Sequence, residues 1–368
     1  QAFLLLRSGG GIGYITPGGI YADNGSGELR EMLLEHCQWD WLFGFENRDK
    51  IFDIHRSFKF CAFVASKGGS TKVVRVSFMN RKLAAWDEGA ADKMTVSQVK
   101  AFSPKSGSFL EIRGKRDLEI LEKIYGNPNV VLLGDESERG WGIKYGSEYH
   151  MTNDAKLFPS IAKWEEKGYR SDEYGHWLKG DWRPYTGPDT NLAVPSDPRL
   201  RPAGTVLSQD RAFILNLDTL EDVALPLYQG VMINHFDFAA KYYVAGAGNR
   251  TQWADQEPGR KIIRPQFLMG QSTFESKSMG AKLLFRDISN ATNQRTFIGA
   301  VTPDWPAGNT TPVLAPSNGS IIDLSAVLTS LVSDYILRIR MTGTHLNYFV
   351  IEELPILAPI VVESLSRT

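Results

Sequence analysis

One stretch near the start of the chain, SGGGIGYITPGGIYADNGSGELREMLL (Ser8–Leu34), restricts the possible folds more than any other. Within it, Ile12–Ile15 is a short apolar run between glycines, which predicts a strand buried on both faces. Pro17 ends that strand, and Ser26 can cap a helix because apolar residues follow it at helical spacing. A buried strand of this kind needs parallel neighbours, so the stretch predicts one step of a layered α/β sheet.

Few residues precede this strand, and QAFLLLRSGG resembles the tail of a helix that glycines stop. Parallel neighbours for the strand would have to come from upstream of these residues. The chain also begins with Gln1 rather than Met. We therefore expect it to be a fragment of a longer protein.

The composition is that of an ordinary globular protein with room for two domains. The chain has 368 residues, of which 42% are hydrophobic and 23% charged, and a single core usually stops growing near ~250–300 residues. No apolar run approaches the ~18–20 residues of a membrane span. Two cysteines, Cys37 and Cys61, are fewer than a secreted disulfide scaffold would carry, which favours a cytoplasmic protein. The net charge of −1 leaves the partner open.

The residues after the first helix predict the end of a sheet and then a change of character. Alternating or aromatic runs predict antiparallel strands at Gln38–Glu46, Phe58–Ser66 and Lys72–Met79. An amphipathic helix is expected at Arg116–Tyr125. Beyond about residue 130, aromatic residues and prolines are scattered among loops, and a second periodic helix is expected at 321–335.

Few chemical motifs pass a test of their spacing. The early glycines do not form G-x-G-x-x-G, because the third glycine position falls on Tyr14 or Thr16. The histidines and cysteines show no metal-ligand spacing, so no metal site is predicted. The triplets DAK (154–156) and ESK (275–277) resemble the end of a nuclease motif, but such triplets arise readily by chance.

A basic segment between Arg250 and Arg295 points to a partner. Eight Lys and Arg residues stand there against four Asp and Glu residues, so eight minus four gives an excess of four positive charges. Phosphate contacts use Lys and Arg, and base edges are read by Arg, Asn and Gln. A solvated surface accounts for the excess equally well.

Several stretches together resemble the DNA adenine-N6 methyltransferases of type IIG restriction-modification systems and related phage-defence methylases, over nearly the whole chain. The most specific match is an ordered pair, GGGIGYITPGGIYADNG with the helix ELREMLL and then KIFDIHRSFKFCAFVASKGG. In that family, similar regions follow the catalytic tetrapeptide. Looser resemblance to the target-recognition domain is carried by LPLYQGVMINHFDF, KLLFRDISNATNQRTFIGAV and LTSLVSDYILRIRMTGTHLNYFVIEELPI.

The resemblance implies an α/β fold, namely the C-terminal part of a Rossmann-like methyltransferase sheet followed by an α+β target-recognition domain. Residues 1–103 would belong to the methyltransferase part, 104–140 to a linker with a helix, and 141–368 to the recognition domain. The implied partner is double-stranded DNA, and the implied cofactor of the full-length protein is S-adenosylmethionine.

The implied reaction methylates a flipped adenine, and flipping calls for an aromatic platform. The resemblance gives this role to Phe52, for which an ordinary core position is the alternative, while Phe58 and Phe60 are expected to pack inside. The residues predicted to contact DNA are Arg250, Arg260, Lys261, Arg264, Arg286, Arg295 and His345. For the last three, a structural salt bridge or core hydrogen bond is an equal alternative.

Two motifs of the family do not occur in this sequence. Its donor-binding glycine motif and its Asn-Pro-Pro-Tyr tetrapeptide should both lie upstream. Because the tetrapeptide holds the adenine amino group, we expect no methyl transfer, and no cofactor bound, by this chain alone. The alternative interpretation is a non-enzymatic DNA-specificity or interaction protein.

Overall fold

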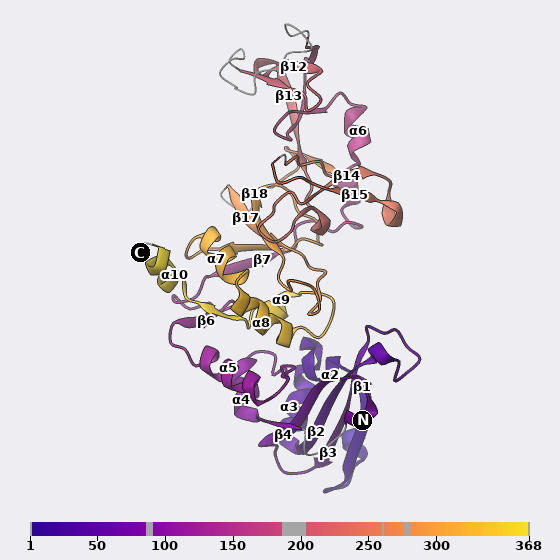
Figure 1. Cartoon of the computed structure of the whole chain (residues 1–368), viewed down its shortest axis with the longest axis vertical. Coiled ribbons are helices and arrows are strands. Elements are labelled where there is room, and N and C mark those ends of the chain that lie inside the picture. The colour runs from indigo at the N-terminus through magenta and orange to yellow at the C-terminus, as the bar shows by residue number, and fades with distance from the viewer. Residues whose placement is uncertain (1, 86–90, 186–203, 260, 276–279, 367–368) are drawn as a thin grey trace. The chain divides into compact units, whose positions relative to one another are not determined.

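The computed structural model describes residues 2–85, 91–185, 204–259, 261–275 and 280–366 (Figure 1). Contacts divide the chain into two compact units. Unit 1 consists of Gln1–Ile143, Ile288–Phe297 and Pro316–Thr368, and unit 2 of Lys144–Asp287 and Ile298–Ala315. Both contain helices and small sheets, so the fold is mixed α/β. The functional division expected at residues 103 and 140 stays a prediction. By contacts, residues 316–368 pack with residues 1–143 in unit 1.

A five-stranded sheet lies in unit 1, with the strand order β1-β3-β2-β4-β5. Its strands are β1 (Gly11–Pro17), β2 (Cys37–Glu46), β3 (Lys59–Lys67), β4 (Val73–Asn80) and β5 (Asp92–Thr95). β3 runs antiparallel to β1 and to β2, β4 runs parallel to β2, and β5 runs antiparallel to β4. The three strands predicted after the first helix are confirmed, although the pair β2–β4 is parallel.

The predicted first strand is present as β1, but its surroundings differ from the prediction. β1 is an edge strand, and its neighbour among the described residues, β3, is antiparallel. Much of it is exposed, with Ile15 at 63%. The prediction of burial on both faces between parallel neighbours is wrong, because a short apolar run between glycines suits a sheet edge as well as a sheet centre.

Helices accompany this sheet and enclose an aromatic core. They are α1 (Ala2–Leu5), α2 (Gly19–Ala22), α3 (Gly27–His36), α4 (Val96–Phe102) and α5 (Lys115–Tyr125), which confirms the helices predicted at the start of the chain and at 116–125. Ser26 precedes α3 as predicted, but its side chain makes no capping bond. In the core, the ring of buried Trp39 lies 5.8 Å from that of Phe63 and 5.2 Å from that of Phe109.

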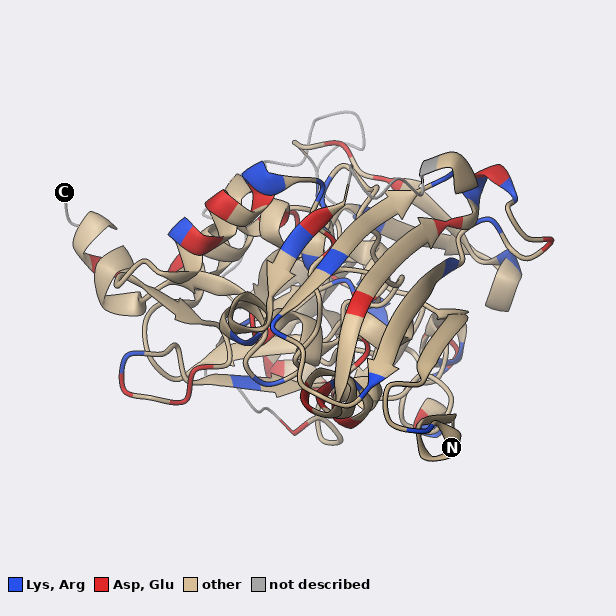
Figure 2. Cartoon of the chain, turned by 90° about the horizontal axis from the view of Figure 1, so that it is seen from below, with Lys and Arg blue, Asp and Glu red and all other residues tan. Residues whose placement is uncertain are grey.

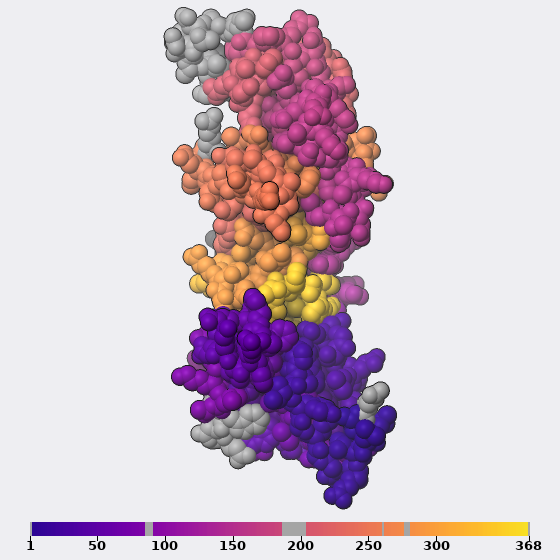
Figure 3. All heavy atoms as spheres, turned by 90° about the vertical axis from the view of Figure 1, so that its right-hand side faces the viewer, coloured from indigo at the N-terminus to yellow at the C-terminus, as the bar shows by residue number. Residues whose placement is uncertain are grey.

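The C-terminal segment completes unit 1. It contains α7 (Ile321–Leu328), α8 (Leu331–Arg340), α9 (Tyr348–Ile351), β20 (Pro355–Leu357), which pairs with β6 (Val130–Leu132), and α10 (Pro359–Ser366). The prediction of a single helix at 321–335 is wrong, because the first helix ends at Leu328 and a second begins at Leu331. Ser330 caps this second helix, α8, by accepting a hydrogen bond from the Ser333 amide. Figure 3 shows these C-terminal atoms, in yellow, against the purple N-terminal part of the same unit.

Unit 2 consists of small sheets joined by loops. The strand orders are β18-β17-β19-β7, β16-β13-β9-β8 and β10-β12-β11, with a further pair β14-β15. The elements are β7 (Ile143–Gly146), α6 (Ile161–Glu165), β8 (Arg170–Ser171), β9 (Trp177–Gly180), β10 (Arg183–Pro184), β11 (Thr205–Leu207), β12 (Phe213–Asn216), β13 (Leu220–Pro226), β14 (Lys241–Ala245), β15 (Gln252–Asp255), β16 (Leu268–Gly270), β17 (Ala281–Phe285), β18 (Gly299–Pro303) and β19 (Val313–Pro316). One of its core clusters contains Trp164, Tyr169 and Trp177.

Candidate nucleic-acid interface

The residues of unit 2 that the sequence predicts to contact DNA have different environments. Arg250 is exposed at the end of a short 3-10 helix, and Arg264 is half-buried. Lys261 is tied to the protein, since its Nζ donates to Asp237 Oδ2 at 2.6 Å and to the Ala239 carbonyl at 3.2 Å. Arg260 lies outside the described residues.

Two other cations of the basic segment make their interactions within the protein. Arg286 donates from Nε and Nη2 to the Ile233 carbonyl, at 3.0 and 2.5 Å, and burial lowers the pKa of its guanidinium. Lys282 is fully buried and pairs with Glu148 at 2.9 Å and with Asp304 at 3.4 Å. The charge excess along the sequence therefore does not amount to one DNA-facing surface. For Arg286, the structural alternative is the one that its hydrogen bonds support.

The other two predicted residues, Arg295 and His345, lie in unit 1 on two loops that meet. Ile288 forms an isolated β-bridge with His345, and the Ser289 amide donates to the Thr344 carbonyl at 3.1 Å. His345 is exposed. Arg295 is half-buried, and its Nη1 has no hydrogen-bond partner among the residues that the structure describes.

Helix α8 fixes the loop that carries Arg295. Arg338 donates to the carbonyls of Ala291 at 2.6 Å and Gln294 at 2.8 Å. Asp334 accepts a hydrogen bond from the Thr296 amide at 2.6 Å and pairs with Arg338 at 2.8 Å. The two side chains are four residues apart, so they lie on the same face of the helix.

Phe52 lies in the loop between β2 and β3, which a single buried amide organises. Asn47 Nδ2 donates to the carbonyls of Phe52 and Ile54 at 3.0 Å and of His55 at 3.4 Å, while Oδ1 accepts a bond from the Phe52 amide at 2.9 Å. Asn47 itself is fully buried. We call residues 47–58 the Asn47 loop.

The aromatic rings of the Asn47 loop are partly exposed. Phe52 is 40% exposed and meets Phe60 edge-on, with ring centroids 5.0 Å apart. Phe60 is buried as predicted, but Phe58 is 44% exposed, so the prediction that Phe58 packs inside is wrong. Phe58 precedes the first residue of β3 and therefore does not share the alternation of that strand.

A pocket of about 350 Å³ joins the Asn47 loop to the two loops near Arg295 and His345, and we call it the basic pocket. It is lined by Glu46, Arg48, residues 55–57 and Lys59, together with residues 290–292 and 341–344, and its cations outnumber its one carboxylate. All of these residues belong to unit 1. The structure thus brings the surroundings of Phe52, Arg295 and His345 to one place, which the distances along the sequence do not reveal.

The cations of the basic pocket differ in how far they are neutralised. Arg48 pairs with Glu46 at 3.3 Å, and Lys59 pairs with Glu111 at 2.6 Å. Arg56 is exposed and makes no ion pair with another described residue. Elsewhere Lys and Arg are interspersed with Asp and Glu, as Figure 2 shows for one view of the chain. Arg56 is therefore available to an external anion.

The arrangement suits contact with a nucleic acid. Guanidinium and ammonium groups bind phosphate oxygens. An exposed aromatic face can stack on a base, which contributes about 1–3 kcal/mol per base. The basic pocket and Phe52 place both types of group in one unit.

Sequence reasoning missed Asn47 and Arg56. Asn47 opens the polar run NRDK, and Asn is typical of turns, which is the one available signal. Its role depends on carbonyl groups up to eight residues away, and those positions follow only from the folded loop.

Other site types find no support in the described residues. No group of three or more His, Cys, Asp or Glu side chains there could hold a metal ion. Cys37 and Cys61 are free and buried, and burial raises the pKa of the Cys61 thiol to about 11. No helix within the described ranges has the length and apolar character needed to cross a membrane.

Comparison with known proteins yields likenesses in solved structures only. No protein-family model matches the chain, and no curated protein matches it. The type IIG restriction endonuclease BpuSI is 10% identical, with a TM-score of 0.32 over 100% of this chain and 42% of BpuSI. A chain described as a modification subunit of a type I restriction enzyme from Vibrio vulnificus YJ016 is 17% identical, with a TM-score of 0.25 over 32% of this chain and 29% of that one.

A third solved structure is a chain from a type I restriction-modification system. It is 18% identical to this chain, with a TM-score of 0.18 over 23% of this chain and 17% of that one. The chain thus spans less than half the length of each of these three structures. Scores this low do not assign it to a family, and what the comparisons have in common is a restriction-modification context.

Proposed function

We propose that the chain is part of a DNA methyltransferase of a restriction-modification or phage-defence system, and that its own activity is to bind double-stranded DNA. The observation that carries the proposal is the Asn47 loop, which holds the partly exposed Phe52 and also supplies Arg48, His55 and Arg56 to the basic pocket. The sequence resemblance adds the finer points, which are adenine-N6 methylation and S-adenosylmethionine as the donor for the full-length protein.

In this proposal, unit 1 contacts the DNA in two ways. Arg56 and the other cations of the basic pocket bind phosphates and so position the duplex. Phe52 stacks on the extruded adenine and replaces part of the stacking that the base loses on leaving the helix. Unit 2 contributes recognition of the target sequence, in which Arg250 and Arg264 take part.

Binding of a fluorescent DNA duplex, followed by anisotropy at increasing salt concentrations, tests the proposal. The logarithm of the binding constant should fall linearly with the logarithm of the salt concentration, with a slope of about −0.9 for each phosphate contacted. Arg56→Gln should make this slope shallower by about one contact. Phe52→Ala should weaken binding by about 1–3 kcal/mol without changing the slope, because stacking releases no counterions.

Lys123→Gln is the matched control for the charge change, since Lys123 is an exposed cation of unit 1 on α5, outside the basic pocket. It should bind DNA as the unaltered chain does. The proposal fails if the unaltered chain shows no affinity for duplex DNA at low salt. The assignment to the basic pocket fails if Arg56→Gln and Lys123→Gln behave alike.

A further inference from the structure

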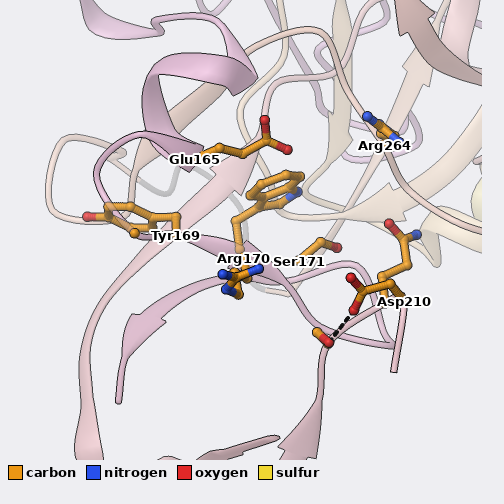
Figure 4. A pocket seen from close by; sticks show the side chains of 10 residues that line it. Glu165, Tyr169, Arg170, Ser171, Asp210 and Arg264 are labelled. Atoms are coloured by element: carbon orange, nitrogen blue, oxygen red, sulfur yellow. Dashed lines mark hydrogen bonds between the residues drawn. The ribbon is translucent and has the colours of Figure 1, made fainter. Parts of the chain in front are cut away.

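Unit 2 contains a pocket of about 410 Å³, which Figure 4 shows from close by. Its walls come from the last residue of α6 and the turn that follows, from β8 and the first residue of β9, from the loop between β11 and β12, and from Arg264. In the view of Figure 4, Glu165 and Arg170 lie on one side, and Asp210 and Arg264 lie on the other. The volume is within the range of about 300–1,000 Å³ that is usual for small-molecule sites.

Two hydrogen-bond donors at this pocket are unused. Trp177 is only 3% exposed, and its Nε1 is buried without a hydrogen-bond partner in the described part of the chain. The Nε of Arg264 is also buried, and it too has no hydrogen-bond partner among the described residues. Buried polar groups are nearly always paired. Two unpaired donors around one cavity therefore point to a ligand that accepts hydrogen bonds.

The pocket also contains fixed charges of both signs. Asp210 Oδ1 accepts hydrogen bonds from Ser208 Oγ at 2.5 Å and from the Ala212 amide at 3.0 Å. These bonds lower the pKa of the Asp210 carboxyl, so it is ionised at neutral pH. The guanidinium of Arg170 lies over the Phe213 ring, 3.7 Å from its centroid. A ligand in this pocket would therefore lie near the fixed carboxylate of Asp210 and the fixed guanidinium of Arg170.

Groups of this kind select a ligand that offers both acceptors and donors. Guanine does so, because its O6 and N7 accept hydrogen bonds from Arg, while its N1–H and amino groups donate to a carboxylate. Inorganic phosphate could pair with Arg170 and Arg264, but the Glu165 and Asp210 carboxylates would repel its oxygen atoms, so it should bind more weakly than guanine. Adenine carries an amino group where guanine carries O6, so it would set a donor against the unused donors.

We propose that this pocket binds a guanine base, with Trp177 and Arg264 as donors to the base and Asp210 as the acceptor for its N1–H and amino groups. The inference rests on the proposed function for the source of the base, which is DNA. The base-binding chemistry itself is shared by a free guanine nucleotide.

Calorimetric titration of the full chain with four probes tests the inference: guanosine, inosine and adenosine monophosphates, and inorganic phosphate. The guanosine nucleotide should bind roughly tenfold more tightly than the adenosine nucleotide. The inosine nucleotide should bind more weakly than guanosine, because it lacks the amino group. Asp210→Asn should abolish the preference for the guanosine nucleotide over the inosine nucleotide. Arg264→Gln should weaken guanosine binding roughly tenfold.

Matched controls are Asp218→Asn and Lys156→Gln, which change exposed charges of unit 2 outside the pocket. Both should leave the ranking of the nucleotides unchanged. Equal affinity for all four probes, or no binding of the guanosine nucleotide, would overturn the inference. Identical behaviour of Asp210→Asn and Asp218→Asn would do the same. Should Arg264→Gln fail to fold, the nucleotide ranking in the unaltered chain and in Asp210→Asn still decides.

A competition experiment identifies the source of the base. Single-stranded DNA with one guanine should displace the guanosine nucleotide, whereas the same strand with adenine should not. If the guanine strand fails to compete, the ligand is a free nucleotide and the DNA source is wrong. Affinity for duplex DNA without guanosine binding would refute the pocket assignment alone, and guanosine binding without any DNA affinity would refute the proposed function alone.

Discussion

Arg340 of α8 and Glu353 form a buried ion pair, with 2.5 Å between Nη2 and Oε2. Arg340 also donates to the carbonyls of Phe102 at 2.7 Å and Val350 at 3.0 Å. Glu353 Oε1 accepts a bond from the Ser106 amide at 2.9 Å. These bonds join residues that are far apart in the sequence but belong to unit 1, and they satisfy both charges away from water.

Removing one member of this pair should cost far more than removing an exposed pair. We expect Arg340→Met to lower the free energy of unfolding by about 3–5 kcal/mol, because Glu353 is left buried and unpaired. The double variant with Glu353→Gln should lose less than the sum of the two single variants. Chemical denaturation measures all three.

The control for this prediction is Arg116→Met, which breaks an exposed contact with Glu119 on α5. An exposed ion pair contributes about 0–1 kcal/mol. If Arg340→Met and Arg116→Met destabilise the protein equally, the buried pair does not have the role assigned to it.

The Asn47 loop depends on one side chain for its shape. The Asn47 amide makes its bonds to the loop backbone and not to the aromatic rings. The position of Phe52 therefore follows from the backbone frame, and its ring keeps an edge-on contact with Phe60 of β3.

Asn47→Ala should disturb both the stability and the DNA contact of unit 1. We expect a loss of about 1–3 kcal/mol in the free energy of unfolding, because several hydrogen bonds to a buried amide disappear. DNA affinity should fall as well, since Phe52 loses its fixed position. Asn47→Asp keeps the acceptor for the Phe52 amide but sets a buried carboxylate oxygen against the carbonyls of the loop, so it should destabilise the protein at least as much as Asn47→Ala.

Denaturation and anisotropy measurements on the same samples check this prediction. Asn153→Ala is the control, because Asn153 is exposed in unit 2. An Asn47→Ala variant with unaltered stability and DNA affinity would show that the loop holds its shape without the amide.

Strands and helices were predictable from the sequence where their own residue pattern specifies them. The burial of single side chains and the breaks between helices were less predictable. Aromatic and alternating side chains specify β2 and β3 locally, so those strands were predictable. The break at Ser330 was not, because the apolar spacing of α7 continues into α8 across it. In the basic segment, Lys282 could not be recognised as an internal cation, since its partner Glu148 lies 134 residues away.

Neither of the two units is a continuous segment of the chain. The chain passes from one unit to the other after residues 143, 287, 297 and 315. Composition marks a change of character only near the first of these points. The later boundaries between the units depend on contacts such as those of α8 with the loop 288–297. No local sequence pattern predicts these contacts.

We expect the purified chain to transfer no methyl groups from radiolabelled S-adenosylmethionine to duplex DNA, because its sequence contains no Asn-Pro-Pro-Tyr tetrapeptide to hold the adenine amino group. An active adenine methyltransferase assayed in parallel is the positive control. Incorporation of label above background by the chain alone would refute the prediction.

The way Asn47 holds its loop has a consequence for protein engineering. Its hydrogen bonds go to main-chain groups, which every residue type except proline provides in full. The side chains at the tip can therefore be exchanged as a set, while the frame that carries them is kept. A library randomised at Phe52, Asp53 and Ile54 would sample new contact surfaces on a constant scaffold.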